Sequence, residues 1–268
     1  MPGEAGPPQR PEQVRSDSLF WLFGWYLRWY FWRRFHAVRL SRGGLPSVPA
    51  NRPLIIYSNH PSWWDPALYI LLQTKLFPGR RGFGPMDAAA LGKYGLLARM
   101  GVFGIELDSP RGAARFLRTS LALLADPRNV LWITAEGAFT DPRTRPVRLR
   151  PGVAHLARHI PGAVLLPLAI EYSFWNESRP EALARFGAPI ETGRERGVAE
   201  WQALLEAALT GTMDALAAES EARNPGLFVP LVRGGAGVGG IYDAQRRARA
   251  LLHGRRFDPT HGGREAGD

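Results

Sequence analysis

The stretch PLIIYSNHPSWWDP, residues 53–66, joins an apolar run to a short segment that carries a histidine, a serine and an aspartate. The apolar run is rich in β-branched and aromatic residues and follows a proline, as is typical of a strand. The polar segment comes where the strand ends and the next helix is expected to begin. In α/β sheets, the loops at the carboxyl ends of strands hold polar groups against a rigid scaffold. The stretch therefore predicts a buried strand that leads into a candidate reaction centre.

The same alternation of apolar runs and amphipathic stretches continues along the chain. The runs predicted to be strands are 53–58, 102–107, 130–134 and 163–172. The stretches predicted to be helices are about 66–77, 87–99, 111–125, 151–159 and 198–221, with Asp65, Asp87 and Ser109 placed to start the first three. Such an order predicts an α/β fold, in a single domain with a mostly parallel or mixed sheet flanked by helices.

Composition limits the classes of protein that remain. The chain has 268 residues, enough for one large domain, and no cysteine, which excludes disulfides, thiolate metal sites and cysteine nucleophiles. Lysine and arginine number 34 against 24 acidic residues, so the formal net charge is +10. A positive surface favours anionic membranes, acidic substrates or nucleic acid. No recognisable nucleic-acid-binding motif accompanies the arginines, so nucleic acid is not expected as a partner.

Residues 18–40 combine tryptophan and tyrosine with several arginines. The longest uncharged run, 18–27, is shorter than the ~20 residues that span a bilayer, and the arginines follow the apolar stretch instead of preceding it as in a secretory signal. Aromatic rings at headgroup level beside snorkelling arginines predict an aromatic N-terminal membrane-interface helix. A core helix with one wet edge is the alternative.

The two ends of the chain are expected to lie outside the folded domain. Residues 1–17 are proline-rich and are expected to be disordered. Residues 223–268 are rich in glycine and arginine and are expected to form a loosely attached basic tail. The α/β domain is then assigned to residues 41–222.

His60 and Asp65 are the candidate catalytic pair. The carboxylate of Asp65 can hold one imidazole nitrogen, which fixes the tautomer and raises the basicity of the other nitrogen. Ser62 lies between them but lacks the Gly-x-Ser-x-Gly context of a nucleophile elbow. The simplest chemistry is therefore direct: His60 removes a proton from an acceptor hydroxyl while that oxygen attacks an activated acyl carbon. A His-x4-Asp pattern also arises by chance, and an aspartate at a helix start needs no catalysis.

A metal site is a weaker interpretation. His155 and His159 are spaced i, i+4 on a predicted helix and would present two ligands on one face. No glutamate follows His155 as in zinc peptidases, and no third ligand has usable spacing. A metal-dependent hydrolase is therefore disfavoured.

Four stretches together resemble a known family. In order and spacing they resemble the four sequence blocks of the 1-acylglycerol-3-phosphate acyltransferases, also called lysophospholipid acyltransferases, over about residues 51–191. The stretches are NHPSWWDP (59–66), MGVFGIELDSPRGAARFLR (100–118), ITAEGAFTDPRTRPVRLRPGVAHLA (133–157) and AVLLPLAIEY (163–172). The positions that match the family's motifs are Asn59, His60, Ser62, Asp65, Glu136, Gly137, Arg150 and Gly152.

This resemblance implies a function. A fatty acyl group would pass from acyl-CoA or acyl carrier protein to a lipid hydroxyl, with His60 and Asp65 as the charge-assisted base. Neither a metal, nor a cofactor beyond the acyl donor as co-substrate, nor a covalent enzyme intermediate is implied. The other matching residues would bind substrate, and residues 41–222 would be the acyltransferase domain. The partners would be membrane lipids and the donor, at the cytoplasmic face of the cell membrane, with peripheral or monotopic attachment.

Two departures from the family bear on the acceptor. Leu107 and Phe139 stand where the family carries arginines that pair with the acceptor's phosphate. A forked guanidinium suits a phosphate, and apolar side chains do not replace it. The nearby arginines that would restore the charge are Arg111, Arg115, Arg143 and Arg145. Otherwise the acceptor is expected to have a neutral or larger head, such as a glycolipid. The alternative is a catalytically silent lipid-binding or membrane scaffold protein of the same fold.

Overall fold

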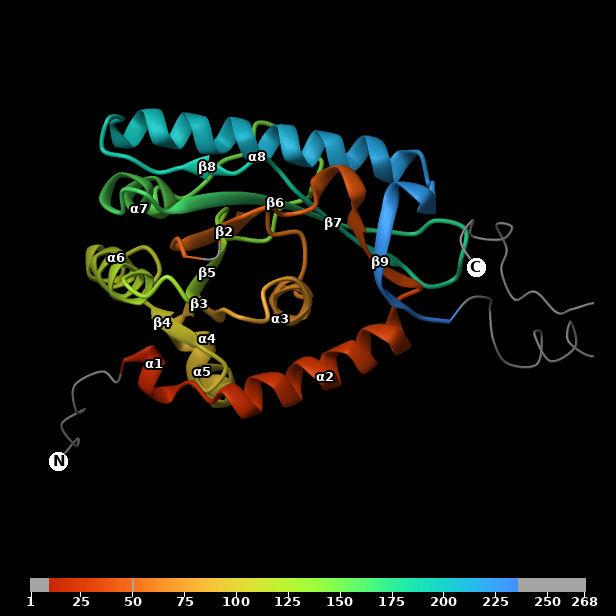
Figure 1. Ribbon diagram of the computed structural model, residues 1–268, viewed down its shortest axis with the longest axis horizontal. Helices are drawn as coiled ribbons and strands as arrows, with labels where there is room; N and C mark the ends of the chain where they lie inside the picture. The colour runs from red at the N-terminus through yellow and green to blue at the C-terminus, as the bar shows by residue number, and fades with distance from the viewer. Residues whose placement is uncertain (1–9, 50, 236–268) are drawn as a thin grey trace, which may run out of the picture.

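Strand β2 (Leu54–Ser58) lies inside the sheet, and its side chains alternate between two hydrophobic cores. Ile55 and Tyr57 belong to one core, and Leu54 and Ile56 belong to the other. All five residues of the strand are buried, as expected where helices cover both faces of a sheet. The computed structural model describes residues 10–49 and 51–235 (Figure 1).

The described residues form a nine-stranded mixed sheet in the order β4-β3-β5-β2-β6-β7-β1-β9, with β8 paired to β6. The pairs from β4 to β6 are parallel, as is β7 with β1, whereas β6 with β7, β6 with β8 and β1 with β9 are antiparallel. The other strands are β1 (Ala37–Ser41), β3 (Arg81–Asp87), β4 (Val102–Ile105), β5 (Asn129–Thr134), β6 (Val164–Ser173), β7 (Glu181–Phe186), β8 (Ile190–Glu191) and β9 (Phe228–Arg233). The predicted single α/β domain with a mixed sheet is confirmed.

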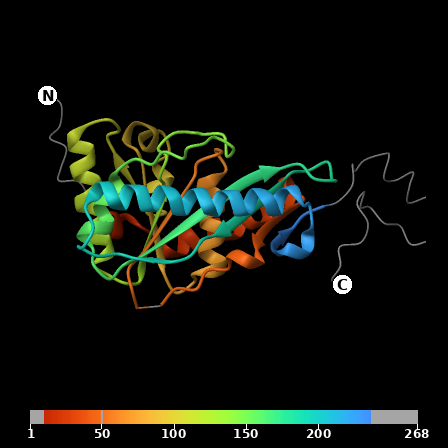
Figure 2. The ribbon, with the colours of Figure 1, turned by 90° about the horizontal axis from the view of Figure 1, so that it is seen from above.

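Helices form a layer on each side of the sheet (Figure 1). Helices α6 (Pro110–Leu124), α7 (Gly152–His159) and α8 (Val198–Glu221) cover one face, and α8 runs along β6 and β7 (Figure 2). Helices α2 (Asp17–Arg34) and α3 (Asp65–Leu76) cover the other. The short elements are α1 (Pro11–Val14), α4 (Ala88–Lys93), α5 (Gly95–Ala98), η1 (Arg42–Gly44) and η2 (Pro225–Leu227).

The amino end is ordered earlier than expected. The prediction of disorder over residues 1–17 is wrong from residue 10 onward, because residues 10–17 pack against the domain. The Arg15 guanidinium lies 4.6 Å from the centre of the Phe20 ring and 5.6 Å from that of Phe83. The amide of Ser16 donates to the carbonyl of Arg99 at 2.8 Å. Residues 1–9 lie outside the described part.

The aromatic helix ends at Arg34, and the last residues of the predicted 18–40 segment form strand β1 instead. A buried ion pair explains the difference, since Arg39 Nε donates to Glu181 Oε2 at 3.0 Å across the β1–β7 pair. A charged residue inside a buried strand hides the strand's apolar pattern. Among the described residues, no helix is both long enough and apolar enough to cross a membrane.

The expected tail contributes to the sheet. Strand β9 pairs antiparallel with β1, and Phe228 and Val232 are buried in the two cores, so the prediction of a loose tail is wrong for residues up to 233. The remainder of that predicted tail, 236–268, lies outside the described residues. The predicted helix 87–99 is divided into α4 and α5 at Tyr94, and Asp87 does cap α4.

Candidate active site

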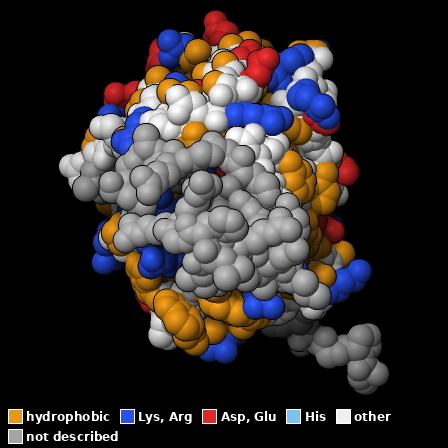
Figure 3. Space-filling model, turned by 90° about the vertical axis from the view of Figure 1, so that its right-hand side faces the viewer, with side chains coloured by type: hydrophobic (Ala, Val, Ile, Leu, Met, Phe, Trp, Pro, Cys, Tyr) orange, Lys and Arg blue, Asp and Glu red, His pale blue; other side chains and the backbone are white. Residues whose placement is uncertain are grey.

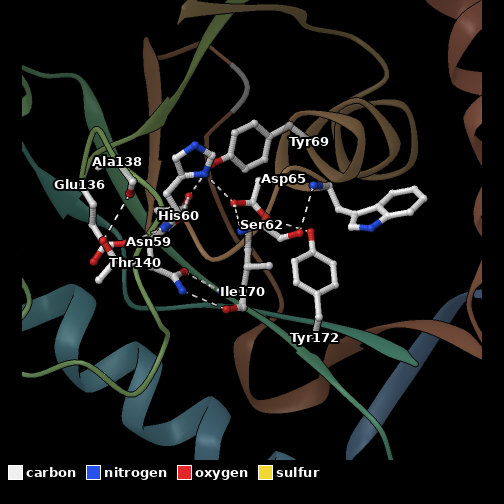
Figure 4. A network of polar contacts seen from close by, with 12 residues as sticks. Asn59, His60, Ser62, Asp65, Tyr69, Glu136, Ala138, Thr140, Ile170 and Tyr172 are labelled. Atoms are coloured by element: carbon white, nitrogen blue, oxygen red, sulfur yellow. Dashed lines mark hydrogen bonds and ion pairs between the residues drawn. The ribbon is translucent and has the colours of Figure 1, made fainter. Parts of the chain in front are cut away.

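His60 and Asp65 are in contact just beyond the carboxyl end of β2 (Figure 4). His60 Nδ1 lies 2.7 Å from Asp65 Oδ2, and the exposed fraction of the Asp65 side chain is 0%. We assign the ring proton to Nδ1, because a carboxylate oxygen accepts and does not donate. Nε2 then keeps its lone pair, and within residues 10–49 and 51–235 it makes no hydrogen bond. The ring is therefore oriented with one basic nitrogen available.

Asp65 is the first residue of α3, not the residue before it, and its carboxylate folds back toward the loop. Oδ2 also accepts from the amide of Ser62 at 3.1 Å, and Oδ1 accepts from the hydroxyl of Tyr172 at 2.8 Å. Both oxygens of this buried carboxylate are therefore hydrogen-bonded, which fixes its orientation toward His60. Burial and the neighbouring Asp65 raise the pKa of Tyr172 well above its ordinary value, so Tyr172 remains a donor.

Two side chains hold the backbone of the His60 loop. The side-chain amide of Asn59 donates to the carbonyl of Ile170 at 2.9 Å and accepts from its amide at 2.8 Å, which fastens the loop to β6. Glu136 Oε2 accepts from the amide of His60 at 2.6 Å (Figure 4). Burial raises the pKa of Glu136, and the bond from His60 opposes that shift. These predicted site residues thus position His60.

Ser62 also shapes the loop. Its hydroxyl accepts from the amide of Trp64 at 3.3 Å, and its amide binds Asp65 as described above. Both contacts are within the turn that leads into α3. A substrate-binding role for the Ser62 side chain stays a prediction.

Gly137 and Gly152 make room for large neighbours. Gly137 has φ of +72°, and a Cβ there would overlap the Arg150 side chain. A Cβ at Gly152 would lie 2.8 Å from the ring of Phe116. Arg150 Nη1 donates to Asp108 Oδ1 at 2.7 Å. The three predicted positions therefore lie close to the His60 loop and to α6, and their contacts with substrate remain predictions.

A cavity of about 930 Å³ extends from His60 to Phe20 of α2. Apolar side chains from the ends of β3 and β4 and from α5 and α6 supply most of its wall, including Phe83, Leu97, Met100, Val102, Ile105 and Leu117. Gly137, Arg150 and Gly152 line it as well. A volume of roughly 300–1,000 Å³ is usual for ligand pockets. The candidate base thus lies in the wall of a ligand-sized apolar cavity.

Comparisons with known proteins give a matching family and a similar fold. A sequence model of the family described as Acyltransferase matches residues 39–171, which include His60, Asp65, Glu136 and Arg150. The chain belongs to the acyltransferase family. The crystal structure of the 1-acyl-sn-glycerophosphate (LPA) acyltransferase PlsC from Thermotoga maritima is similar, with a TM-score of 0.51 over 75% of this chain and 79% of that chain. The two are 13% identical, so the likeness concerns the fold. Sequence comparison with curated proteins gives no significant match.

The acyltransferase has apolar side chains, Leu107 and Phe139, at the two positions where its sequence departs from the family's motifs. The ring centre of Phe139 lies 4.4 Å from that of His60, and 64% of Phe139 is exposed. Leu107 is 41% exposed, and both residues line the cavity. Phe139 therefore covers one side of the imidazole at the place where the family has an arginine.

Four nearby arginines were candidates to replace the charge of the family's two arginines. None of the four is among the described residues that line the cavity. Arg143 pairs with Asp141 at 2.7 Å, and Arg145 pairs with Asp214 at 2.6 Å. Arg111 and Arg115 are exposed on α6. In the acyltransferase, Arg150 is the one arginine or lysine of the described cavity wall, and Asp108 already pairs with it.

His155 and His159 do not form a metal site within the described residues. Within residues 10–49 and 51–235, no three potential metal ligands lie together. His159 Nδ1 instead lies 2.7 Å from the carbonyl of His155. In the acyltransferase these two residues are stacked on α7, with ring centres 6.4 Å apart.

Tyr172 is the site residue that the sequence motifs missed. It lies in the stretch AVLLPLAIEY, at the end of β6, where the sequence indicated only a strand. Its position near the carboxyl end of a predicted strand could have indicated a role in the site. Because β6 is parallel to β2, this end of β6 lies at the same edge of the sheet as His60.

Replacing Tyr172 with phenylalanine is expected to reduce stability and slow the reaction. The change leaves Asp65 Oδ1 buried without its donor, which costs about 1–3 kcal/mol of unfolding free energy. The imidazole is then held less firmly, so we expect kcat to fall while KM changes little. Denaturant unfolding and steady-state kinetics on Tyr172→Phe test both effects. Unchanged stability and unchanged kcat would contradict the role assigned to Tyr172.

Proposed function

We propose that the protein is a membrane-surface lipid O-acyltransferase in which His60 is the general base and Asp65 orients it. The observation that carries this proposal is the His60–Asp65 contact of 2.7 Å in the wall of the apolar cavity. The donor is a fatty acyl thioester, acyl-CoA or acyl carrier protein, and the acceptor is a lipid hydroxyl. The resemblance of the sequence motifs supports the choice of donor.

The reaction needs one proton shuttle. His60 Nε2 takes the proton from the acceptor hydroxyl as that oxygen forms a bond to the thioester carbonyl carbon. The carbon–sulfur bond then breaks, and the thiolate takes the proton from the imidazolium. The buried carboxylate of Asp65 stabilises the imidazolium between these steps. Acyl thioester and alcohol thus become ester and thiol.

The cavity suits the acyl chain of the donor. Each methylene that leaves water for an apolar wall is stabilised by about 0.8 kcal/mol. The wall reaches Phe20, a residue of the same helix that carries the exposed aromatic side chains. A chain bound in the cavity would therefore lie close to the membrane interface that we propose next.

Helix α2 has two different faces. Its buried residues Phe20, Gly24, Leu27 and Phe31 face the domain, and Gly24 lies close enough to α3 that a Cβ would be 2.8 Å from Thr74. The opposite face exposes large hydrophobic side chains: Trp21 (45%), Leu22 (64%), Trp25 (71%), Tyr26 (43%), Trp29 (45%) and Trp32 (49%). A contiguous exposed patch of this kind marks an interaction surface, and tryptophan-rich faces favour the headgroup region. We propose that this face attaches the enzyme to the cytoplasmic leaflet.

Replacing Trp25 and Trp29 together with serine is expected to weaken binding to lipid vesicles by roughly tenfold or more, because apolar area that inserts into the interface is lost. Both side chains are exposed, so the fold should persist. Vesicle flotation measures the binding, and Trp201→Phe, a buried change in α8, is a control for tryptophan loss away from α2. Equal vesicle binding by the double variant and the parent would move the membrane contact to another surface. Deleting residues 1–40 would be a poorer test, because it also removes most of β1.

The charges in the cavity bear on the acceptor. Asp87, Glu106 and Asp108 line it together with Arg150, which is already paired. A phosphomonoester head would meet these carboxylates and apolar walls without a free cation among the described residues. We therefore propose an acceptor with a neutral or larger head, such as a glycolipid.

The experiment that tests the proposed function uses labelled acyl-CoA, anionic vesicles and a total lipid extract. The expected product is a labelled lipid whose acyl group is released by mild base, as an ester is. Repeating the assay with acyl carrier protein thioesters identifies the preferred donor. The absence of labelled lipid with both donors would contradict the proposal.

A further inference from the structure

A second hollow lies at the C-terminal end of α2, apart from the catalytic cavity. Its volume is about 560 Å³, and the described residues that line it are Trp32, Arg33, Arg34, Arg179 and Gly235. Arg33 and Arg34 belong to the last turn of α2, whereas Arg179 belongs to the connection between β6 and β7. Segments far apart in the sequence therefore bring three arginines to one hollow.

None of the described residues that line this hollow is a carboxylate. Neither Arg33 nor Arg179 has an ion pair or a hydrogen bond to any described residue, and Arg34 lies over the ring of Tyr30 at 5.4 Å. Basic residues in the last turn of a helix are favoured by the helix dipole, which accounts for Arg33 and Arg34. The dipole does not account for Arg179. Three like charges around one hollow indicate an anionic ligand.

Gly235 lies beside Arg179 in the wall of the hollow. A Cβ there would lie 3.1 Å from Arg179 Nη1, which is tighter than an ordinary contact. The preceding Gly234 donates from its amide to the carbonyl of His36 at 2.7 Å, so the chain after β9 is held against the end of α2. The guanidinium of Arg179 therefore lies beside the backbone of Gly235 at the edge of the hollow.

The hollow adjoins the aromatic face of α2. Trp32 lines the hollow and is also one of the exposed residues of that face. In Figure 3, which views this end of the molecule, hydrophobic side chains gather along the lower edge, where α2 lies in Figure 1, with basic side chains beside them. If the aromatic face lies at headgroup level, the hollow lies at the level of lipid phosphates.

We propose that this hollow binds the phosphate of an anionic phospholipid headgroup and so fixes the orientation of the enzyme on the membrane. The inference rests on the membrane face in the proposed function, but not on the chemistry at His60. A forked guanidinium pairs with phosphate oxygens, and two or three such groups select an anionic headgroup over a zwitterionic one.

The test compares vesicles of phosphatidylcholine with vesicles that also contain phosphatidylglycerol. For the full chain, Arg179→Gln should weaken binding to the anionic vesicles by about fivefold, the usual effect of one basic residue at a membrane surface, and leave binding to phosphatidylcholine unchanged. Arg118→Gln on α6 is the matched control. Arg118 is exposed and lies away from the hollow, and its replacement removes the same charge. Arg179→Lys should recover part of the loss. Equal binding by Arg179→Gln and Arg118→Gln would overturn the site.

A second arm distinguishes a lipid phosphate from a soluble one. Calorimetry without vesicles uses inorganic phosphate and coenzyme A as probes, and no binding that depends on Arg179 is expected. If either probe binds through Arg179 while vesicle binding does not depend on it, the lipid assignment is overturned. His60→Ala separates the two proposals, because it should lose acyl transfer yet keep its Arg179-dependent preference for anionic vesicles.

Discussion

His60→Ala is expected to lower kcat by ~10²–10⁴-fold, the usual contribution of a positioned general base. Nε2 is the nitrogen that the Asp65 contact leaves available, and no other described histidine forms such a pair with a buried aspartate. The side chain contributes little to the core, since it lies in the cavity wall. The variant should therefore fold, with circular dichroism and a melting temperature close to those of the parent.

Asp65→Asn is the companion variant for this prediction. The amide can donate to Nδ1 and so favour the tautomer whose Nε2 carries the proton, which removes the base without removing the ring. We expect a smaller loss of kcat than for His60→Ala, accompanied by some loss of stability. Initial rates with saturating donor give kcat for both variants. A folded His60→Ala protein with a near-normal rate would end the general-base mechanism.

Lysophosphatidic acid is expected to be a poor acceptor, with kcat/KM roughly 10²-fold or more below that of the best neutral acceptor. Leu107 and Phe139 replace two arginines of the family, and each lost charge-assisted bond costs about 1.5–3 kcal/mol. The described cavity wall offers Arg150 alone, which Asp108 already engages at 2.7 Å. Competition between lysophosphatidic acid and a panel of glycolipids and lysolipids measures the preference.

The double variant Leu107→Arg, Phe139→Arg tests whether the two apolar side chains cause the poor use of lysophosphatidic acid. It should improve the use of lysophosphatidic acid more than that of the native acceptor, because only the phosphate gains charged partners. Arg143→Gln serves as a control, since Arg143 is exposed and paired with Asp141 away from the cavity. Efficient acylation of lysophosphatidic acid by the parent, above every neutral acceptor, would contradict the prediction.

Much of the fold was predictable from periodicity, and the failures have identifiable physical causes. The apolar runs at β2, β5 and β6 and the amphipathic pattern at α8 gave correct elements because both faces of these strands, or one face of the helix, are buried. Strand β1 was missed because the buried Arg39 interrupts its apolar pattern, and its partner Glu181 comes 142 residues later. Such a pair becomes visible only once β1 and β7 lie side by side.

The candidate site was predictable where its residues are close in sequence. His60 and Asp65 belong to one loop, so their contact follows from local geometry. Tyr172 is 107 residues from Asp65, and only the parallel pairing of β2 with β6 brings them together. Phe139 likewise reaches His60 through the loop after β5, whose path no periodicity describes.

The stoichiometry of a single reaction mixture tests the central claim most directly. Purified protein, labelled acyl-CoA and the acceptor identified from the lipid extract are incubated, and free thiol and labelled lipid ester are measured over time. Acyl transfer to a lipid hydroxyl predicts one thiol released for each ester formed, with both rates lost together in His60→Ala. Thiol release without lipid ester, or ester formation that persists at the parental rate in His60→Ala, would contradict the account.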